Sequence, residues 1–251
     1  MPAHKIPVIL FDLGQTLIYS RHPWGPVFQR ADQALLDSLA DSGLHFYPPI
    51  STGEFQTHLN RYYDQRNLDH RELTAFSVLT DFLMSRGYTN LPAEVLRSAL
   101  DAMYAITEEN WFIEADTHSV LDILHEAGFH LGLISNAADD KNVQNMIDHW
   151  DLRRHFEFIL TSAACGMRKP HPYMFQAALE YFAVPPDRTA MLGDTLLADI
   201  AGANSLGIYT IWITRHAQTP PDGILAVQPD AVISSLEQLP ALLVDIDQQD
   251  E

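Results

Sequence analysis

Polar side chains that could act together on a charged substrate stand at the ends of several apolar runs. Asp12 comes directly after the run 8–11, four apolar residues that predict a buried strand. Ser135 and Asn136 end a second run, and Asp194 ends a third. A carboxylate next to a buried strand is costly unless a cation or hydrogen bonds hold its charge. The sequence therefore points to a charged site and not merely to strand ends.

A lysine is expected at the same place. The run 156–160 leads through a glycine-containing loop to Lys169, which lies between Arg168 and Pro170. In parallel α/β sheets, ligands bind just beyond the carboxyl ends of the strands. If these runs are neighbouring strands, the two aspartates, the serine and the lysine converge. That set suits a metal-assisted reaction on an anion.

Each of these residues also has an ordinary structural explanation. Asp12 could be a solvated aspartate that ends a strand, Ser135 a helix cap, and Lys169 an exposed loop residue. The recurrence of the same arrangement favours the site.

The elements that would position these residues alternate between helix and strand from residue 116 onward. Such alternation predicts an α/β fold with a parallel sheet and right-handed crossovers. We expect helices at 117–126, 139–149, 172–182, 196–206 and up to about 244, and strands at 130–134, 156–160, 189–192, 208–213 and 231–233. The acidic residues from 245 to 251 are expected to fray.

The stretch between the first strand and residue 116 differs. Residues 21–26 contain two prolines and a glycine, which is typical of a loop. From about Val27 to Trp111, apolar residues recur at helical spacing without a buried strand. We expect an all-helical insert.

Four motifs, in this order, make the chain similar to the haloacid dehalogenase-like hydrolases, in the branch with a helical cap after the first strand. The resemblance covers residues 6–215. Its motifs are Asp12-Leu13-Gly14-Gln15-Thr16-Leu17, Ser135-Asn136, Lys169-Pro170, and Gly193-Asp194 with Asp199. The resemblance implies a Rossmann-like catalytic core at 1–20 and 113–251 and a cap at 21–112.

The same resemblance implies a Mg²⁺-dependent phosphohydrolase that acts on a small phosphorylated metabolite. Asp12 would be the nucleophile and form an aspartyl-phosphate. Asp12, Asp194 and the Gly14 carbonyl would supply oxygen ligands to Mg²⁺. Ser135, with backbone N–H groups of Asn136 and Ala137, would bind the phosphate. Lys169 would neutralise the phosphate and the nucleophile.

Asp199 lies five positions after Asp194, which on a helix is a rotation of about 140°. The two carboxylates therefore cannot share one helical face, so Asp194 should end the strand while Asp199 sits in the next helix. There Asp199 could hold a metal-bound water, orient Lys169, or only place charge at a helix N-terminus.

One position departs from the family. Its phosphatases usually carry a second aspartate, the general acid and base, where this chain has Gly14, and often a glycine where it has Gln15. General acid–base help is worth about 10²–10⁴-fold in rate, so slow turnover of poor leaving groups is expected. His22 or a cap residue could supply the proton.

Two other functions stay open. A metal-independent 2-haloacid dehalogenase would share the aspartate nucleophile, but such enzymes typically lack the Gly-Asp motif. A catalytically weak binding protein on the same scaffold is supported only by Gly14.

Composition limits the partners and the location. The 251 residues carry a formal charge of −18, which argues against nucleic-acid and anionic-membrane partners. Cys165 is the only cysteine, which we interpret as an ordinary small residue in a reducing compartment. Residues 1–7 show no signal peptide and no apolar stretch reaches membrane-spanning length, so we expect a cytoplasmic protein.

The basic residues of the insert are Arg61, Arg66, His70 and Arg71. We interpret them as a solvated helical face, and Tyr62 and Tyr63 as packing residues.

Overall fold

A computed structural model describes residues 4–217 and 227–248. Over these residues, six strands form one parallel sheet in the order β5-β4-β1-β6-β7-β8. The strands are β1 (Val8–Phe11), β4 (His130–Ser135), β5 (Phe158–Thr161), β6 (Thr189–Gly193), β7 (Tyr209–Ile213) and β8 (Ala231–Ile233). Strand β1 pairs with β4 on one side and with β6 on the other. The predicted α/β class with a Rossmann-like sheet is confirmed.

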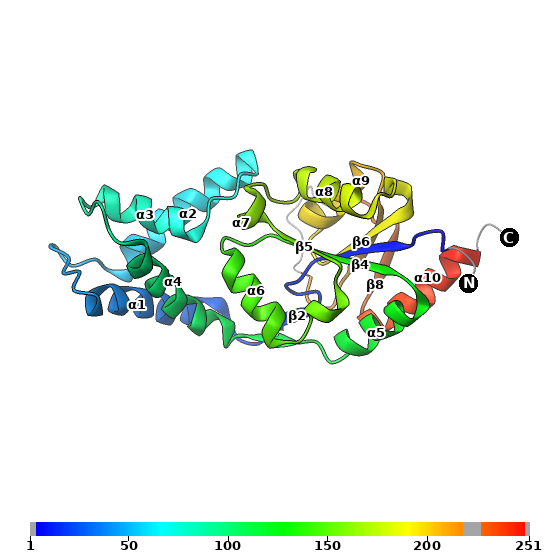
Figure 1. The fold of residues 1–251 in the computed structure, drawn as a ribbon, viewed down its shortest axis with the longest axis horizontal. Helices are drawn as coiled ribbons and strands as arrows, with labels where there is room; N and C mark the ends of the chain where they lie inside the picture. Colours follow the sequence, from blue (N-terminus) through cyan, green and yellow to red (C-terminus); the bar gives the residue numbers. More distant parts are fainter. Residues whose placement is uncertain (1–3, 218–226, 249–251) are drawn as a thin grey trace.

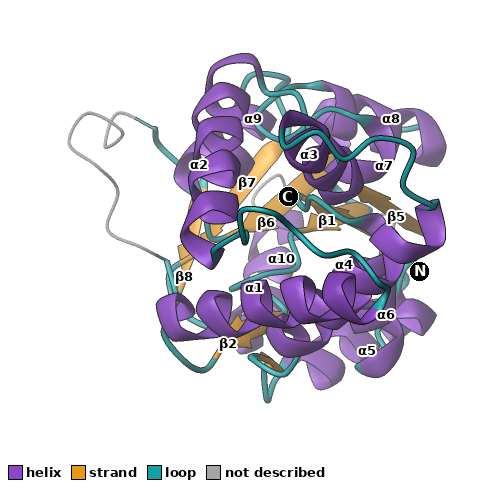
Figure 2. Ribbon diagram, turned by 90° about the vertical axis from the view of Figure 1, so that its left-hand side faces the viewer, coloured by secondary structure: helices purple, strands orange, loops and turns teal. Residues whose placement is uncertain are grey.

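Helices cover both faces of the sheet (Figure 2). One face packs against α5 (Thr117–Ala127), α6 (Asp140–His149) and α10 (Leu239–Gln248), and the other against α8 (Tyr173–Phe182) and α9 (Gly202–Asn204). The alternation along β1 explains both layers, because Ile9 and Phe11 enter the first cluster whereas Val8 and Leu10 enter the second. The short elements are α7 (Ser162–Cys165), η1 (Arg153–His155), η2 (Pro186–Arg188), η3 (Leu196–Ala201) and η5 (Leu236–Gln238).

Most predicted boundaries lie within two residues of the observed ones. The helix predicted at 196–206 is instead a π-helical turn, η3, followed by α9. Helix α10 runs through Gln248, beyond its predicted end at 244, so residues 245–248 are helical and do not fray. The rest of that predicted tail, 249–251, lies outside the described residues.

The insert between β1 and β4 is built of four long helices in the described chain (Figure 1). They are α1 (Trp24–Asp41), α2 (Thr52–Asp69), α3 (Ala75–Ser85) and α4 (Ala93–Glu108). Their buried faces form an apolar core separate from those of the sheet, with Leu35, Leu79 and Leu100 fully buried in it. The predicted all-helical insert is confirmed, while the domain limits at 20/21 and 112/113 stay predictions.

The insert is entered and left through an antiparallel pair, β2 (Ile18–Ser20) and β3 (Trp111–Ile113). Two predicted details are therefore wrong. Trp111 belongs to a strand and not to a helix, and α1 begins at Trp24, inside the segment predicted as a loop. The apolar run of β3 is only three residues long, too short for its periodicity to reveal a strand.

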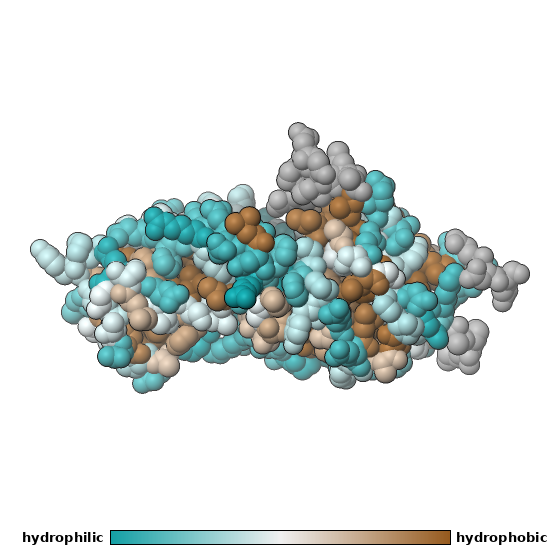
Figure 3. Space-filling model, turned by 90° about the horizontal axis from the view of Figure 1, so that it is seen from above, coloured by the Kyte–Doolittle hydropathy of each residue, from teal (hydrophilic) through white to brown (hydrophobic). Residues whose placement is uncertain are grey.

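Hydrophilic side chains cover much of the insert on the face shown in Figure 3. Among the described helices, none combines the length and apolar character that crossing a membrane requires.

Candidate active site

The site residues meet where three adjacent strands end. Asp12 follows β1, and its N–H donates to the Leu192 carbonyl over 2.9 Å, which continues the strand pairing. Ser135 is the last residue of β4, and Asp194 follows β6. The Trp212 indole N–H donates to the Asp194 carbonyl over 2.8 Å and fixes that strand end. The predicted convergence at one edge of the sheet is confirmed.

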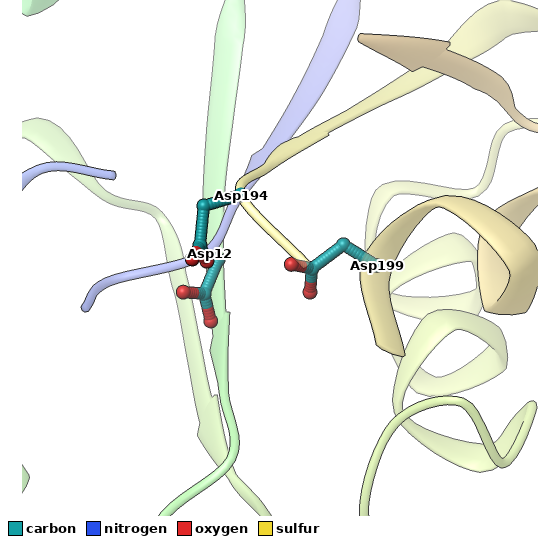
Figure 4. A group of neighbouring side chains, drawn as sticks. All are labelled: Asp12, Asp194 and Asp199. Carbon is teal, nitrogen blue, oxygen red and sulfur yellow. The ribbon is translucent and has the colours of Figure 1, made fainter. Parts of the chain in front are cut away.

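Three carboxylates face one another at this edge (Figure 4). One oxygen from each of Asp12, Asp194 and Asp199 lies within 4.8 Å of the others. Asp194 follows the strand and Asp199 lies on η3, as the five-residue spacing required.

A single buried ammonium group lies against this cluster. The Nζ atom of Lys169 is 2.7 Å from Asp12 Oδ1 and 2.7 Å from Asp199 Oδ1, and it donates to the Ile134 carbonyl over 2.7 Å. Lys169 is 2% exposed. Asp194 accepts a hydrogen bond from the Thr195 hydroxyl at 3.2 Å but forms no ion pair in the described chain. Three acidic side chains thus face one ammonium group.

The backbone of Lys169 is held by the Asn136 side chain, whose Oδ1 accepts from the Lys169 N–H over 2.8 Å and whose Nδ2 donates to its carbonyl over 2.9 Å. Asn136 therefore positions the lysine loop through its side chain, a role that the sequence did not indicate. The Ala137 N–H, expected to bind phosphate, donates to Ser162 Oγ over 2.9 Å instead, so that expectation is wrong for this structure.

The position of Asp199 depends on Gly193. A Cβ at residue 193 would lie 2.4 Å from Asp199 Cγ, a distance that no packing tolerates. Asp199 Oδ2 also accepts the Thr195 N–H over 3.0 Å. Of the roles left open for Asp199, its contact favours orienting Lys169.

Burial and mutual repulsion raise the pKa values of Asp12 and Asp194. Burial raises the pKa of Asp12 to about 6, with Lys169 opposing and Asp199 adding to the shift. Burial, together with the charges of Asp12 and Asp199, raises the pKa of Asp194 to about 8. For Lys169 burial lowers the pKa, but Asp12 and Asp199 outweigh it, so the net shift is upward and the ammonium stays charged.

These residues line a cavity of about 360 Å³. Its wall includes Trp111, whose Cη2 atom would lie 3.2 Å from a Cβ at Gly14. The indole ring thus occupies space that a larger residue at position 14 would need. Gln15 has a φ of 58°, a conformation that favours glycine, which explains why glycine suits this position.

Two other residues named from the sequence are not part of the site. His22 is exposed and does not line the cavity; its backbone N–H donates to Asn110 Oδ1 over 2.9 Å. Burial raises the pKa of the half-buried Cys165, which fits an unreactive thiol.

Glu72 is a key residue that sequence reasoning missed. Its fully buried carboxylate accepts from the Tyr62 hydroxyl at 2.6 Å and from Ser162 Oγ at 2.9 Å. It also pairs with Arg66 at 3.2 Å and with Arg168 at 3.3 Å. Glu72 therefore ties the helical insert to the loop that carries the catalytic-site lysine.

The interpretation of the insert's basic residues holds in part. Arg61 and Arg71 are exposed, as expected for a solvated face. For Arg66 the interpretation is wrong, because its guanidinium pairs with Glu72 and stacks 4.1 Å from the centre of the Tyr63 ring. A run of alternating charges gives no sign of which member is buried.

The residues at this edge of the sheet carry the motifs of a known family. Residues 9–213 match the family described as haloacid dehalogenase-like hydrolase. The chain belongs to the haloacid dehalogenase-like hydrolases. The resemblance inferred from the motifs is thereby confirmed.

Relatives extend this result. The human haloacid dehalogenase-like hydrolase domain-containing protein 3 is 27% identical over 96% of both chains. The Xenopus laevis protein of that name is 31% identical over 56% of each chain. A glyceraldehyde 3-phosphate phosphatase from Pyrococcus furiosus is 33% identical over 46% of this chain and 48% of its own. Apart from the human protein, these matches span about half the length of the relatives.

Two solved structures show the same architecture. A 2-haloacid dehalogenase from Pseudomonas syringae pv. Tomato DC3000 has a TM-score of 0.69 and 26% identity, covering 96% of this chain and 99% of its own. A HAD phosphatase from Thermococcus onnurineus has a TM-score of 0.63 and 21% identity, covering 94% and 97%. The second likeness concerns the fold alone.

The raised pKa of Asp194 predicts a pH-dependent cost to the metal-free fold. The unfolded chain releases this proton near pH 4, whereas the folded protein keeps it up to about pH 8. Stability therefore falls as pH rises through this window, and Asp194→Asn should remove that fall. In EDTA, the Tm of Asp194→Asn should exceed that of the wild type, and the difference should grow from pH 5.5 to pH 8. At pH 8 the difference in the free energy of unfolding should be at least about 1 kcal/mol, which corresponds to roughly 2–4 °C in Tm.

Asp187→Asn, at an exposed aspartate of η2, is the matched control and should show no such trend. A gap for Asp194→Asn that stays constant or shrinks with rising pH would contradict the proposed crowding of the carboxylates.

Proposed function

We propose that the protein is a Mg²⁺-dependent phosphohydrolase that cleaves a small phosphate monoester through an aspartyl-phosphate on Asp12. The observation that carries the proposal is the convergence of three carboxylates and one buried lysine beyond the central strand. Phosphatases are also among the relatives.

The donor set fits a hard divalent cation. Carboxylate oxygens within 4.8 Å of one another repel, and the single ammonium group leaves Asp194 without an ion pair in the described chain. Mg²⁺ prefers oxygen ligands. Asp12, Asp194 and the Gly14 carbonyl would hold it. When bound, it would neutralise charge on the phosphoryl oxygens.

The protein's own groups account for the first step. An oxygen of Asp12 attacks phosphorus, the bond to the leaving oxygen breaks, and the phosphoryl group is transferred to the carboxylate. Lys169 holds Asp12 Oδ1 at 2.7 Å, so the attacking group is oriented before substrate arrives. Lys169 and the Ser135 hydroxyl then stabilise charge on the phosphoryl oxygens.

Position 14, where the family's phosphatases usually carry the general acid, is glycine, so no side chain at that position protonates the leaving group. Leaving groups that depart as stable anions are therefore favoured over alkoxides. The same gap slows hydrolysis of the aspartyl-phosphate, where water must lose a proton.

We infer that the helical insert acts as the cap over this site. A second cavity inside the insert shares three lining residues with the catalytic cavity, Trp111, Asn136 and Asn142. A small-molecule phosphate fits between them. The absence of nucleic-acid and anionic-membrane partners, which rests on the acidic composition, and the cytoplasmic location, which rests on the single cysteine, remain part of this proposal.

A 2-haloacid dehalogenase is the second candidate, favoured by the likeness to the Pseudomonas syringae dehalogenase. The acidic cluster that includes Asp194 argues against it, since carbon–halogen displacement by Asp12 needs no cation. A catalytically weak binding protein is the third.

Hydrolysis of p-nitrophenyl phosphate tests the proposal, because p-nitrophenolate needs no protonation to leave. Turnover should require Mg²⁺, and Asp12→Asn should reduce it at least about 10³-fold by removing the nucleophile. Asp187→Asn should retain full turnover as a surface control. Metal-independent chloride release from 2-chloropropionate would support the dehalogenase instead. The absence of both activities would favour a binding protein.

The contact between Gly14 and Trp111 predicts a coupled pair of substitutions. Gly14→Asp alone should lower turnover because its Cβ meets the indole ring at 3.2 Å. Combining it with Trp111→Ala makes room for the carboxylate, and turnover of alkyl phosphates should rise about 10-fold or more relative to p-nitrophenyl phosphate. The measurement is kcat for both substrates in the single and double variants. An equal change on both substrates in the double variant would refute the acid–base explanation.

A further inference from the structure

A cavity of about 430 Å³, here called the insert cavity, lies between the helices of the insert. Trp111, Asn136 and Asn142 line it and the catalytic cavity alike. The two cavities therefore adjoin at these three residues. A group held in the insert cavity would belong to the substrate whose phosphate lies at Asp12.

Aromatic rings form much of its wall. The seven aromatic lining residues are Trp24, Phe28, Phe55, Tyr62, Tyr63, Tyr104 and Trp111. The Trp24 ring stacks on Phe28 at a centroid distance of 5.0 Å and lies 5.2 Å from the Trp111 ring. Phe28 is 45% exposed, which puts its ring where the cavity meets solvent.

Asp32 is the one carboxylate among the described lining residues. It follows Phe28 by four residues on α1, as Phe28 follows Trp24, so the three side chains share one helix face. Asp32 is 5% exposed, and within the described chain it has neither a hydrogen bond nor an ion pair. Burial alone raises the pKa of Asp32 to about 6, with no neighbouring group opposing it.

The other charged lining residue, Arg66, does not compensate Asp32. Its guanidinium lies 3.2 Å from the Glu72 carboxylate and stacks on Tyr63. The insert cavity therefore offers a buried carboxylate that has no hydrogen bond or ion pair within the described chain, in a wall that also holds seven aromatic residues.

Building on the phosphohydrolase proposed above, we propose that the insert cavity binds an ammonium group, so that the substrate is a phosphate monoester of an amino alcohol. Aromatic faces attract cations, and a desolvated cation–π contact is worth about 2 kcal/mol. A neutral apolar group would leave the buried carboxylate unpaired, and an anionic group would be repelled. An ammonium group would form cation–π contacts with the rings and an ion pair with Asp32.

Binding of two matched probes tests this directly. Choline and 3,3-dimethylbutan-1-ol have the same shape, but only choline carries a positive charge. By calorimetry, choline should bind the wild type at least about 10-fold more tightly than the alcohol. Asp32→Asn keeps the size of the side chain and should reduce that preference to what the aromatic rings alone supply. Asp37→Asn, at an exposed position of the same helix, should keep it. Equal binding of the two probes, or an unchanged preference in Asp32→Asn, would overturn the proposal.

Hydrolysis separates this proposal from the activity on which it builds. The kcat/KM for phosphocholine should exceed that for 3,3-dimethylbutyl phosphate at least about 10-fold in the wild type and Asp37→Asn, and the ratio should be clearly smaller in Asp32→Asn. If choline binds as expected while neither ester nor p-nitrophenyl phosphate is hydrolysed, the ammonium site stands and the phosphohydrolase fails. If p-nitrophenyl phosphate is hydrolysed while choline does not bind, the reverse holds.

Discussion

The buried ammonium of Lys169 is the contact on which the site depends. Without it, three carboxylates would share a small volume at the end of the sheet with no opposite charge. Its three partners come from β1, β4 and η3, so one side chain joins three separate parts of the core. Gly193 allows Asp199 to approach, and Asn136 fixes the lysine backbone. The one acidic side chain of the cluster that Lys169 does not pair, Asp194, is among those we propose as ligands for a divalent cation.

The lysine loop also connects the sheet to the insert. Glu72 binds Arg168 and Ser162 from the core and Tyr62 and Arg66 from α2. Backbone bonds reinforce this junction, since the Glu72 N–H donates to the Gly166 carbonyl and the Arg168 N–H to the His70 carbonyl. A displacement of the insert would therefore also displace the loop that carries Lys169. The helical insert and the lysine loop thus form one connected structure.

Trp111 lies where a side chain at position 14 would otherwise extend. The position that could carry a general acid is glycine, and the indole ring fills the adjacent space. The same ring forms part of the wall of the insert cavity. An aromatic ring thus lies beside the position where the family's phosphatases usually carry a proton donor.

Much of the fold and the site could be predicted from the sequence. Asp12, Ser135 and Asp194 stand at the ends of buried strands, so the sequence alone places them at the carboxyl edge of a parallel sheet. Side-chain contacts between distant segments could not be predicted in this way. Nothing in the sequence distinguishes Glu72 or Asp32 from solvated charges, because the burial of Asp32 depends on packing among the helices of the insert and that of Glu72 on contact with the core. The place of Trp111 could not be predicted for a different reason, because a three-residue strand carries no periodic signal.

The central claim is that Asp12 and Asp194 share one Mg²⁺ ion. Calorimetric titration with Mg²⁺ near pH 7, in two buffers of different ionisation enthalpy, tests it most directly. One ion should bind per chain and release protons, because the carboxyls that are held protonated must ionise to bind it. Asp194→Asn should lose both the binding and the proton release. No binding at millimolar Mg²⁺, or equal binding by Asp194→Asn, would contradict the account.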